Sequence, residues 1–329
     1  MENQELRQDL ITGEWVIIAP GRKKRPLDLI KKNQKRIIAP IKGCPFENPQ
    51  ESGNPPPSFI WPNEKKWQLQ VFPNKYPALS PELSLLKEKK KILYNTMPAF
   101  GYHELIITKD HSKNFPSLSK ENAFMVFFTT KERFLSYKKD KNIKYGFMFH
   151  NWGPTAGASV FHPHYQLIGL PIIPPEVIIS LQGSKKFYQQ HKEYAYSSVI
   201  SFEKKYKKRI IAENDGAIAF TRFASKEPFD VRIFPKKHFP FFEETDNQIL
   251  KSVSEALQIS LSKMKKNLKD PDYNFFLHSA PLTNQSQYSH YHWHIDVIPK
   301  ISISAGMEVG SGIEITVIDP DYSAKILNQ

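Results

Sequence analysis

The stretch His162-Pro163-His164-Tyr165-Gln166 carries polar side chains at alternate positions, directly after the glycine-containing segment Asn151 to Ser159. Side chains of a β-strand point alternately to its two faces, so His162, His164 and Gln166 would share one face, about 6–7 Å from one to the next. A core strand would carry apolar side chains at these positions. The three positions therefore form a polar row and are not part of a core stripe.

A second polar row, His292-x-His294-x-Asp296, follows about 130 residues later. Other elements recur in the same order at nearly the same offset. The pairs are His103 to His111 with Asp230 to His238, Phe147 to His150 with Phe275 to His278, and the two polar rows. A matched order at a nearly constant offset indicates a duplicated α+β unit.

Helical patterns follow the first strand of each copy. Ala123 to Leu135 is apolar and aromatic. In the second copy apolar residues recur every three or four positions behind a Thr245/Gln248 capping box, namely Leu250, Val253, Leu257, Leu261, Met264 and Leu268. The segment Gly183 to Arg209 connects the copies, and its aromatic content predicts packing rather than a flexible linker. Asp319-Pro320 predicts the start of a short helix to Leu327.

Composition limits the class of protein. The chain has 329 residues, 40% apolar and 13% aromatic, enough for one large core or two modules. No signal-peptide pattern is present and no apolar run approaches ~18 residues, so we expect a cytoplasmic protein without membrane contact. The single cysteine, Cys44, cannot form an internal disulfide. The net charge of +13 fits nucleic acid, a membrane surface or small phosphorylated substrates, and charge alone does not choose among them. Without a reader motif, nucleic acid is not an expected partner.

The residue types of the polar row permit three interpretations. A neutral imidazole can attack phosphorus to form a phosphoramidate, and Gly153, Gly157 and Ser159 would offer donors to the phosphate oxygens. Paired histidines on one strand face also suit a metal ion. They can equally be polar strand residues without a chemical role. Spacing alone leaves these interpretations open.

The order of motifs along nearly the whole chain resembles the galactose-1-phosphate uridylyltransferase family, the double-unit branch of the histidine triad superfamily. The most specific motif is His162 to Gln166 in its glycine context. The supporting segments are Arg7 to Pro20 with Arg22 and Arg25-Pro26, Phe72 to Ala78, Gly101 to Glu104, Asp110 to Ser112, His290 to His294 and Ala305 to Gly312.

This resemblance implies an α+β fold of two tandem histidine-triad-like units, with antiparallel half-barrel sheets and flanking helices. We place the units at residues 1–175 and 176–329, packed as one compact body, with the His-Pro-His-x-Gln motif in the first. The family also leads us to expect a homodimer, in which Glu308 completes the site of the neighbouring subunit.

The implied reaction is a ping-pong exchange in which UDP-glucose and galactose 1-phosphate give UDP-galactose and glucose 1-phosphate. His164 would carry the uridylyl group, His162 would orient the site, and Gln166 would hydrogen-bond the transferred phosphoryl group. Single-unit relatives that hydrolyse nucleotides have a histidine at the position of Gln166, and an amide cannot act as acid or base near neutral pH. Glutamine therefore favours transfer over hydrolysis. The positions matching substrate contacts are Arg22, Arg25, Asn74, Asn151, Gly157, Ser159 and, for the hexose, Glu308.

Two metal sites of the family are matched incompletely. Bacterial members bind zinc through Cys-x-x-Cys and two histidines, and the matching residues here are Cys44, Glu47, His111 and His162. Since carboxylate oxygen does ligate zinc, this set is either a complete tetrahedral site or a degraded, empty one. The second site would hold iron or zinc, or be a hydrogen-bonded polar cluster, and its candidates are His278, His294, Asp296 and Glu176.

The sequence leaves three functions open. The first is the uridylyltransferase, with a nucleotide sugar and a hexose 1-phosphate as partners. The second is a phosphorylase of the same double-unit type, acting on ADP-glucose or a dinucleoside polyphosphate through the same histidine. The setting of Glu308 favours a hexose phosphate as acceptor. The third is a binding protein for nucleotides or nucleic acid without catalysis, which would have no need of a nucleophile at His164.

Overall fold

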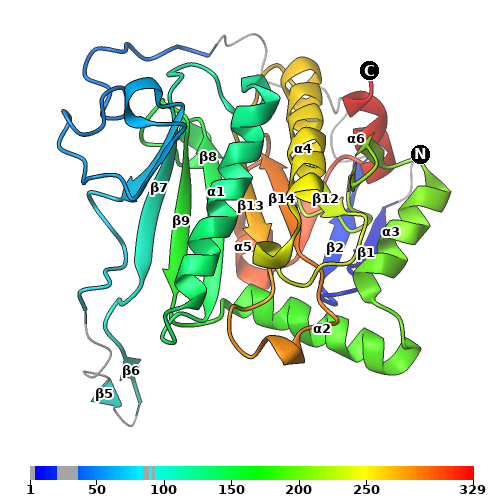
Figure 1. Ribbon diagram of the computed structural model, residues 1–329. Coiled ribbons are helices and arrows are strands. Elements are labelled where there is room, and N and C mark those ends of the chain that lie inside the picture. Colours follow the sequence, from blue (N-terminus) through cyan, green and yellow to red (C-terminus); the bar gives the residue numbers. More distant parts are fainter. Residues whose placement is uncertain (1–3, 21–35, 84–88, 91–92) are drawn as a thin grey trace.

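The structure is a computed structural model that describes residues 4–20, 36–83, 89–90 and 93–329 (Figure 1). The strands are β1 (Glu5–Gln8), β2 (Trp15–Ile18), β3 (Phe59–Trp61), β4 (Leu69–Pro73), β5 (Lys89–Lys90), β6 (Asn95–Thr96), β7 (Tyr102–Thr108), β8 (Tyr145–Trp152), β9 (His164–Leu170), β10 (Ile210–Glu213), β11 (Ala217–Phe220), β12 (Val231–Pro235), β13 (Tyr273–His278), β14 (His294–Pro299) and β15 (Glu314–Thr316). The helices are α1 (Lys120–Lys138), α2 (Pro175–His191), α3 (Ala195–Tyr206), α4 (Asn247–Asn267), α5 (Gly306–Ser311) and α6 (Pro320–Leu327).

The main sheet repeats itself about its centre. Its strand order is β10-β11-β12-β14-β13-β8-β9-β7-β4-β3, and each neighbouring pair is antiparallel. Read outward from the β8–β13 pair, β9 corresponds to β14, β7 to β12 and β4 to β11. This arrangement confirms the duplicated α+β plan expected from the sequence. The division of the chain at residue 175 stays a prediction.

Helices α1 and α4 cover one face of the main sheet (Figure 1). The apolar positions of α4 are buried, and the same core contains Tyr165 and Leu167 of β9 and Ile295 and Val297 of β14. Because strand side chains alternate, the residues between them point to the opposite face. Both polar rows therefore lie on the face away from α1 and α4.

The first turn of α4 differs from the expected capping box. Asp246 is the N-cap residue, and its side chain accepts a hydrogen bond from the backbone N–H of Ile249 at 2.9 Å. Thr245 instead accepts a hydrogen bond from the indole N–H of Trp293 at 2.8 Å. The Thr245/Gln248 prediction is therefore wrong, because Thr245 links the loop to the core and leaves capping to its neighbour.

The segment between the two copies packs against the main sheet, as its aromatic content predicted, and it is helical. It forms α2 and α3, whose buried side chains, among them Leu181 and Tyr196, pack against Phe220 and Phe234 of the main sheet. The short C-terminal helix is also confirmed, because Asp319 caps α6 through the backbone N–H of Asp321 at 2.7 Å.

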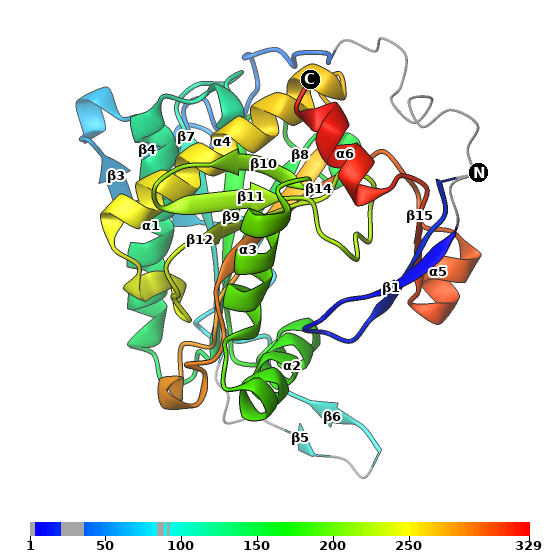
Figure 2. The same ribbon diagram turned by 90° about the vertical axis from the view of Figure 1, so that its right-hand side faces the viewer.

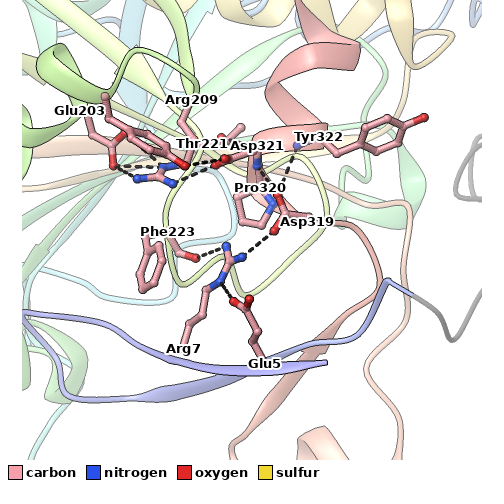
Figure 3. Close-up of polar contacts among 11 residues, drawn as sticks. Glu5, Arg7, Glu203, Arg209, Thr221, Phe223, Asp319, Pro320, Asp321 and Tyr322 are labelled. Atoms are coloured by element: carbon pink, nitrogen blue, oxygen red, sulfur yellow. Dashed lines mark hydrogen bonds and ion pairs between the residues drawn. The ribbon is translucent and has the colours of Figure 1, made fainter. Parts of the chain in front are cut away.

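The two ends of the chain meet on one side of the molecule. Strand β2 pairs with β1 on one edge and, in parallel, with β15 on the other, and Figure 2 shows β1, β15 and α5 together. Arg7 of β1 pairs with Asp319 at 2.6 Å, while Arg209 pairs with Asp321 at 2.9 Å (Figure 3). These contacts hold the first strand and the last helix on the same body.

Within the described ranges, no helix combines the length and the apolar character needed to cross a bilayer.

Candidate active site

The first polar row lies at the start of β9. The strand begins at His164, and its pairing with β7 begins at the Ile107–His164 pair. The expectation that His162 belongs to the same strand row is wrong, because the strand begins only at His164 and His162 lies before it. His164 and Gln166 do share one face, opposite to Tyr165 and helix α1.

His164 and Gln166 line a cavity of about 240 Å³. The expected substrate residues Asn74 and Ser159 line the same cavity. The ring of Phe46 packs against the imidazole of His164 at a tilt of 55°, with 5.3 Å between the ring centres. Only 6% of the His164 surface is exposed, so a substrate would meet a largely desolvated imidazole.

The hydrogen bonds of His164 fix which of its nitrogens is free. Its Nδ1 lies 2.9 Å from the backbone carbonyl oxygen of His162. A carbonyl only accepts, so Nδ1 carries the proton and Nε2 keeps its lone pair in the neutral ring. Burial lowers the pKa of His164, which favours the neutral form. The ring is thus prepared as a nucleophile at Nε2.

The glycine segment before β9 is a tight turn. Its backbone N–H groups at Gly157 and Ala158 donate to the carbonyls of Pro154 and Gly153, so the turn itself uses them. Gly153 has φ +86°, and a Cβ there would collide with the carboxylate of Asp272. That carboxylate accepts hydrogen bonds from the backbone and side chain of Thr155. Gly153 is therefore required for a close approach to Asp272.

The other expected substrate residues are more dispersed. Arg22 and Arg25 lie outside the described residues. Asn151 projects from β8 on the face that carries His164, where its side-chain oxygen accepts a hydrogen bond from Asn274 at 2.7 Å. Glu308 belongs to α5, and its carboxylate accepts a hydrogen bond from the backbone N–H of Ala305 at 2.9 Å. Within the described chain neither Asn151 nor Glu308 lines the His164 cavity, and neither does Gly157.

A cluster of metal-ligand type adjoins the cavity. One ligand atom each of Cys44, His111 and His162 lie within 4.8 Å of one another. The Nε2 atoms of His111 and His162 lie 2.9 and 2.7 Å from the backbone carbonyls of Ala39 and Thr108, so each ring donates there. Both Nδ1 atoms then keep their lone pairs, and Nδ1 of His162 lies 3.5 Å from Sγ of Cys44. Histidine ligands of metal ions are commonly oriented by this kind of second hydrogen bond.

Glu47 lies beside this cluster, next to His111. Its Oε2 lies 4.0 Å from Nδ1 of His111. Both atoms are buried, and among the described residues neither has a hydrogen-bond partner. Two buried acceptors without a donor are costly unless something positive lies between them. Burial also lowers the pKa of His162 to about 4, which keeps the ring neutral as a ligand. The residues Cys44, Glu47, His111 and His162 thus fit a zinc ion.

The second cluster has a different character. Ligand atoms of His278, His294 and Asp296 lie within 4.8 Å of one another, and with Glu176 these residues line a cavity of about 600 Å³. However, both oxygens of Asp296 are engaged by the guanidinium of Arg232, at 2.6 and 2.8 Å. The carboxylate is already neutralised by a cation from the chain itself. A metal ion at this cluster stays a prediction.

Two family profiles match this chain, one in each half. The sequence profile described as galactose-1-phosphate uridyl transferase, N-terminal domain, matches residues 1–174, and the HIT domain profile matches residues 203–301. The chain belongs to the galactose-1-phosphate uridylyltransferase family. It is therefore an enzyme of the nucleotidyltransferase class with a histidine triad fold, and the α+β fold class expected from the sequence is confirmed.

Two kinds of protein are similar to this chain along nearly their whole length. An ADP-glucose phosphorylase from Arabidopsis thaliana is 31% identical over 100% of this chain and 94% of its own. A galactose-1-phosphate uridylyltransferase from Thermotoga maritima is 24% identical over 99% of this chain and 98% of its own. The crystal structure of the Arabidopsis thaliana ADP-glucose phosphorylase with bound ADP-glucose has a TM-score of 0.85 at 29% identity, covering 99% of both chains. A uridylyltransferase structure has a TM-score of 0.76 at 25% identity, covering 99% of this chain and 97% of its own.

Two residues that contact candidate site residues were not identified from the sequence. His103 contacts the side chain of Gln166 from the neighbouring strand β7, and Arg232 reaches Asp296 from β12. Both lie in the repeated strand segments, so their secondary structure was predicted. Their partners follow from strand register, which a single sequence does not provide.

Proposed function

We propose that this chain transfers the nucleotidyl group of a nucleotide sugar to Nε2 of His164 and then to a phosphate-bearing acceptor. The observation that carries the proposal is the lone pair of Nε2 on a buried, neutral imidazole, in the same cavity as Gln166. A metal ligand at His164 would need the same lone pair, but among the described residues the ligand atoms that cluster are those of Cys44, His111 and His162, without His164.

In the first half-reaction, Nε2 forms a bond to the α-phosphorus and the bond to the bridging oxygen breaks. The sugar 1-phosphate leaves with that oxygen, and the nucleotide remains as a phosphoramidate on His164. The ring becomes positive as it attacks, and its Nδ1–H remains bonded to the carbonyl oxygen of His162, whose dipole stabilises the charge. In the second half-reaction an acceptor phosphate oxygen attacks the same phosphorus and Nε2 recovers its electron pair.

Gln166 has a role limited to hydrogen bonding. Its amide can donate to an oxygen of the transferred phosphoryl group but cannot remove a proton from water. The phosphoramidate would therefore react slowly with water and faster with a phosphate acceptor, which is already an anionic nucleophile. This property distinguishes transfer from hydrolysis at an otherwise similar site.

ADP-glucose, with inorganic phosphate as acceptor, is the substrate pair that we place first. The similarity to the ADP-glucose phosphorylase, at 31% identity and a TM-score of 0.85, supports this choice. It replaces the uridylyltransferase reaction as the leading proposal. UDP-glucose with galactose 1-phosphate remains the second candidate, supported by the Thermotoga maritima relative. A hexose contact by Glu308 would need the partner subunit of a homodimer, since Glu308 does not line the His164 cavity of its own chain.

Zinc is the metal proposed for Cys44, Glu47, His111 and His162. When bound, zinc would supply structural rather than redox chemistry, because it has no accessible second oxidation state. The residues themselves hold His162 in place, and the backbone carbonyl of His162 receives the Nδ1–H of His164. The orientation of the nucleophile thus depends on the position of this ligand cluster.

The experiment is incubation of the protein with ADP-glucose and with UDP-glucose in parallel, followed by intact-mass measurement. An adenylyl adduct that phosphate discharges is expected. His164→Ala should form none, while the exposed His191→Asn, on α2, should behave as wild type. A uridylyl adduct discharged by galactose 1-phosphate would select the second candidate. No adduct from either sugar would contradict the proposal.

A further inference from the structure

The amide of Gln166 contacts a histidine from the adjacent strand. Nε2 of His103 lies 2.9 Å from Oε1 of Gln166. His103 belongs to β7, two residues before Leu105, which pairs with Gln166 in the ladder. Since residues two apart share a face of a strand, His103 lies on the same face as Leu105, whose side chain lines the His164 cavity.

The hydrogen bond at Nδ1 of His103 shows which ring nitrogen carries the proton. The backbone N–H of Ala78 donates to Nδ1 of His103, at 3.0 Å. Nδ1 therefore accepts, and in the neutral ring the proton is on Nε2. Burial favours this neutral form, since it lowers the pKa of His103. The Nε2–H group then needs an acceptor.

Only one of the two amides near Nε2 can be that acceptor. Asn74 has its nitrogen Nδ2 3.1 Å from Nε2 of His103, while its oxygen Oδ1 accepts from the backbone N–H of Tyr76 at 3.0 Å. Its oxygen is thus already used. Oε1 of Gln166 is the remaining acceptor, and the hydrogen bond from His103 fixes which end of the Gln166 amide is oxygen.

We propose that His103 is a positioning residue that holds the Gln166 amide with its NH₂ group directed to the transferred phosphoryl group. This inference rests on the proposed nucleotidyl transfer through His164. Without the hydrogen bond the amide is free to turn its oxygen to the phosphoryl group, where two partial negative charges would repel. His103 touches no reacting atom and acts through Gln166.

Two substitutions separate this role from a structural one. In His103→Asn the side-chain oxygen can still accept the N–H of Ala78, but the shorter side chain cannot reach Gln166. In His103→Gln the terminal NH₂ lies near the position of Nε2 and can still donate to Gln166. We expect His103→Asn to slow adduct formation roughly 10- to 100-fold, less than the roughly 100- to 1,000-fold cost of removing a donor to a developing oxyanion, because the donor on Gln166 is misdirected but still present. The nucleotide-sugar concentration for half-maximal rate should change little, and His103→Gln should recover most of the rate.

The deciding measurement is a double-mutant cycle on the single-turnover rate of adduct formation with ADP-glucose. If His103 acts through Gln166, His103→Asn should cost less than about twofold in a Gln166→Ala background. An equal cost in both backgrounds would overturn the proposal, because His103 would then act through the loop of Asn74 to Ala78 or through the fold. Failure of the proposed function would look different, since the wild type would form no adduct.

Discussion

The backbone carbonyl of His162 accepts the Nδ1–H of His164 at 2.9 Å, so a candidate zinc ligand and the candidate nucleophile are joined by one hydrogen bond. The side chain of His162 points to Cys44, while its main chain holds His164. Displacement of His162 would therefore change the orientation of the nucleophile without touching the substrate. The metal-ligand cluster and the transfer site are therefore coupled through His162.

Loss of Cys44 should accordingly affect both metal content and transfer. For Cys44→Ala we expect the zinc content of the purified protein to fall from one equivalent per chain to nearly none. Adduct formation at His164 should slow about tenfold or more, as when support of a metal site is removed. Elemental analysis by mass spectrometry and the adduct assay measure the two effects. Glu47→Gln, which keeps the volume but removes the charge, should give an intermediate zinc content. Full zinc content without Cys44 would place the ion elsewhere.

The strand framework of this chain was readable from the sequence, because each repeated segment has its own local signal. His103 to His111 and Asp230 to His238 become β7 and β12, at matching places in the main sheet. Errors arose where two neighbours suit the same role. Thr245 and Asp246 are both good N-cap residues, and only the contact of Thr245 with Trp293 decides between them.

In the candidate site, too, features set by local sequence were predicted and features set by strand pairing were not. His164 and Gln166 follow from alternation within one strand, so the sequence placed them on one face. His162 was misplaced because β9 begins only at His164, just as β14 begins only at His294 in the second copy. The Arg232–Asp296 pair joins residues 64 positions apart across two strands. Such a pair depends on register, which hydrophobic pattern and spacing do not reveal.

Arg232 should make the second cluster independent of metal. Because its guanidinium engages both oxygens of Asp296, we expect one zinc equivalent per chain in the wild type and the same value in His294→Ala. Arg232→Met should leave a buried carboxylate unpaired and lower the free energy of unfolding by about 3–5 kcal/mol. Urea unfolding measures this loss. Asp296→Leu together with Arg232→Met should recover much of it, since both charges are then removed. A second zinc equivalent that His294→Ala abolishes would contradict this account.

His278 should link stability to pH. Burial lowers the pKa of His278 from 6.5 to about 4; the charge of Asp296 opposes this shift, and that of Arg232 adds to it. The unfolded chain takes up a proton below its ordinary pKa while the folded chain does not. The stability that the neutral ring contributes is thus complete above about pH 6.5 and is lost as the pH falls toward 4. Between pH 7 and pH 5 the free energy of unfolding should fall by about 1–2 kcal/mol from this group. The urea midpoint should decrease less between pH 7 and pH 5 in His278→Gln than in the wild type. The exposed His191→Gln should keep the wild-type decrease, and an identical decrease in His278→Gln would refute the assignment.

Gln166 should decide between transfer and hydrolysis. The amide offers hydrogen bonds but no proton exchange, so water is a poor acceptor for the nucleotidyl group on His164. In Gln166→His an imidazole would stand beside the phosphoramidate and could take the proton of an attacking water. We expect spontaneous discharge of the adduct, measured as nucleoside monophosphate release without phosphate, to rise about tenfold or more. Gln166→Asn, which keeps an amide but shortens its reach, should slow adduct formation without raising hydrolysis. Equal hydrolysis in the wild type and Gln166→His would mean that the exclusion of water from the cavity, rather than the chemistry of residue 166, protects the intermediate.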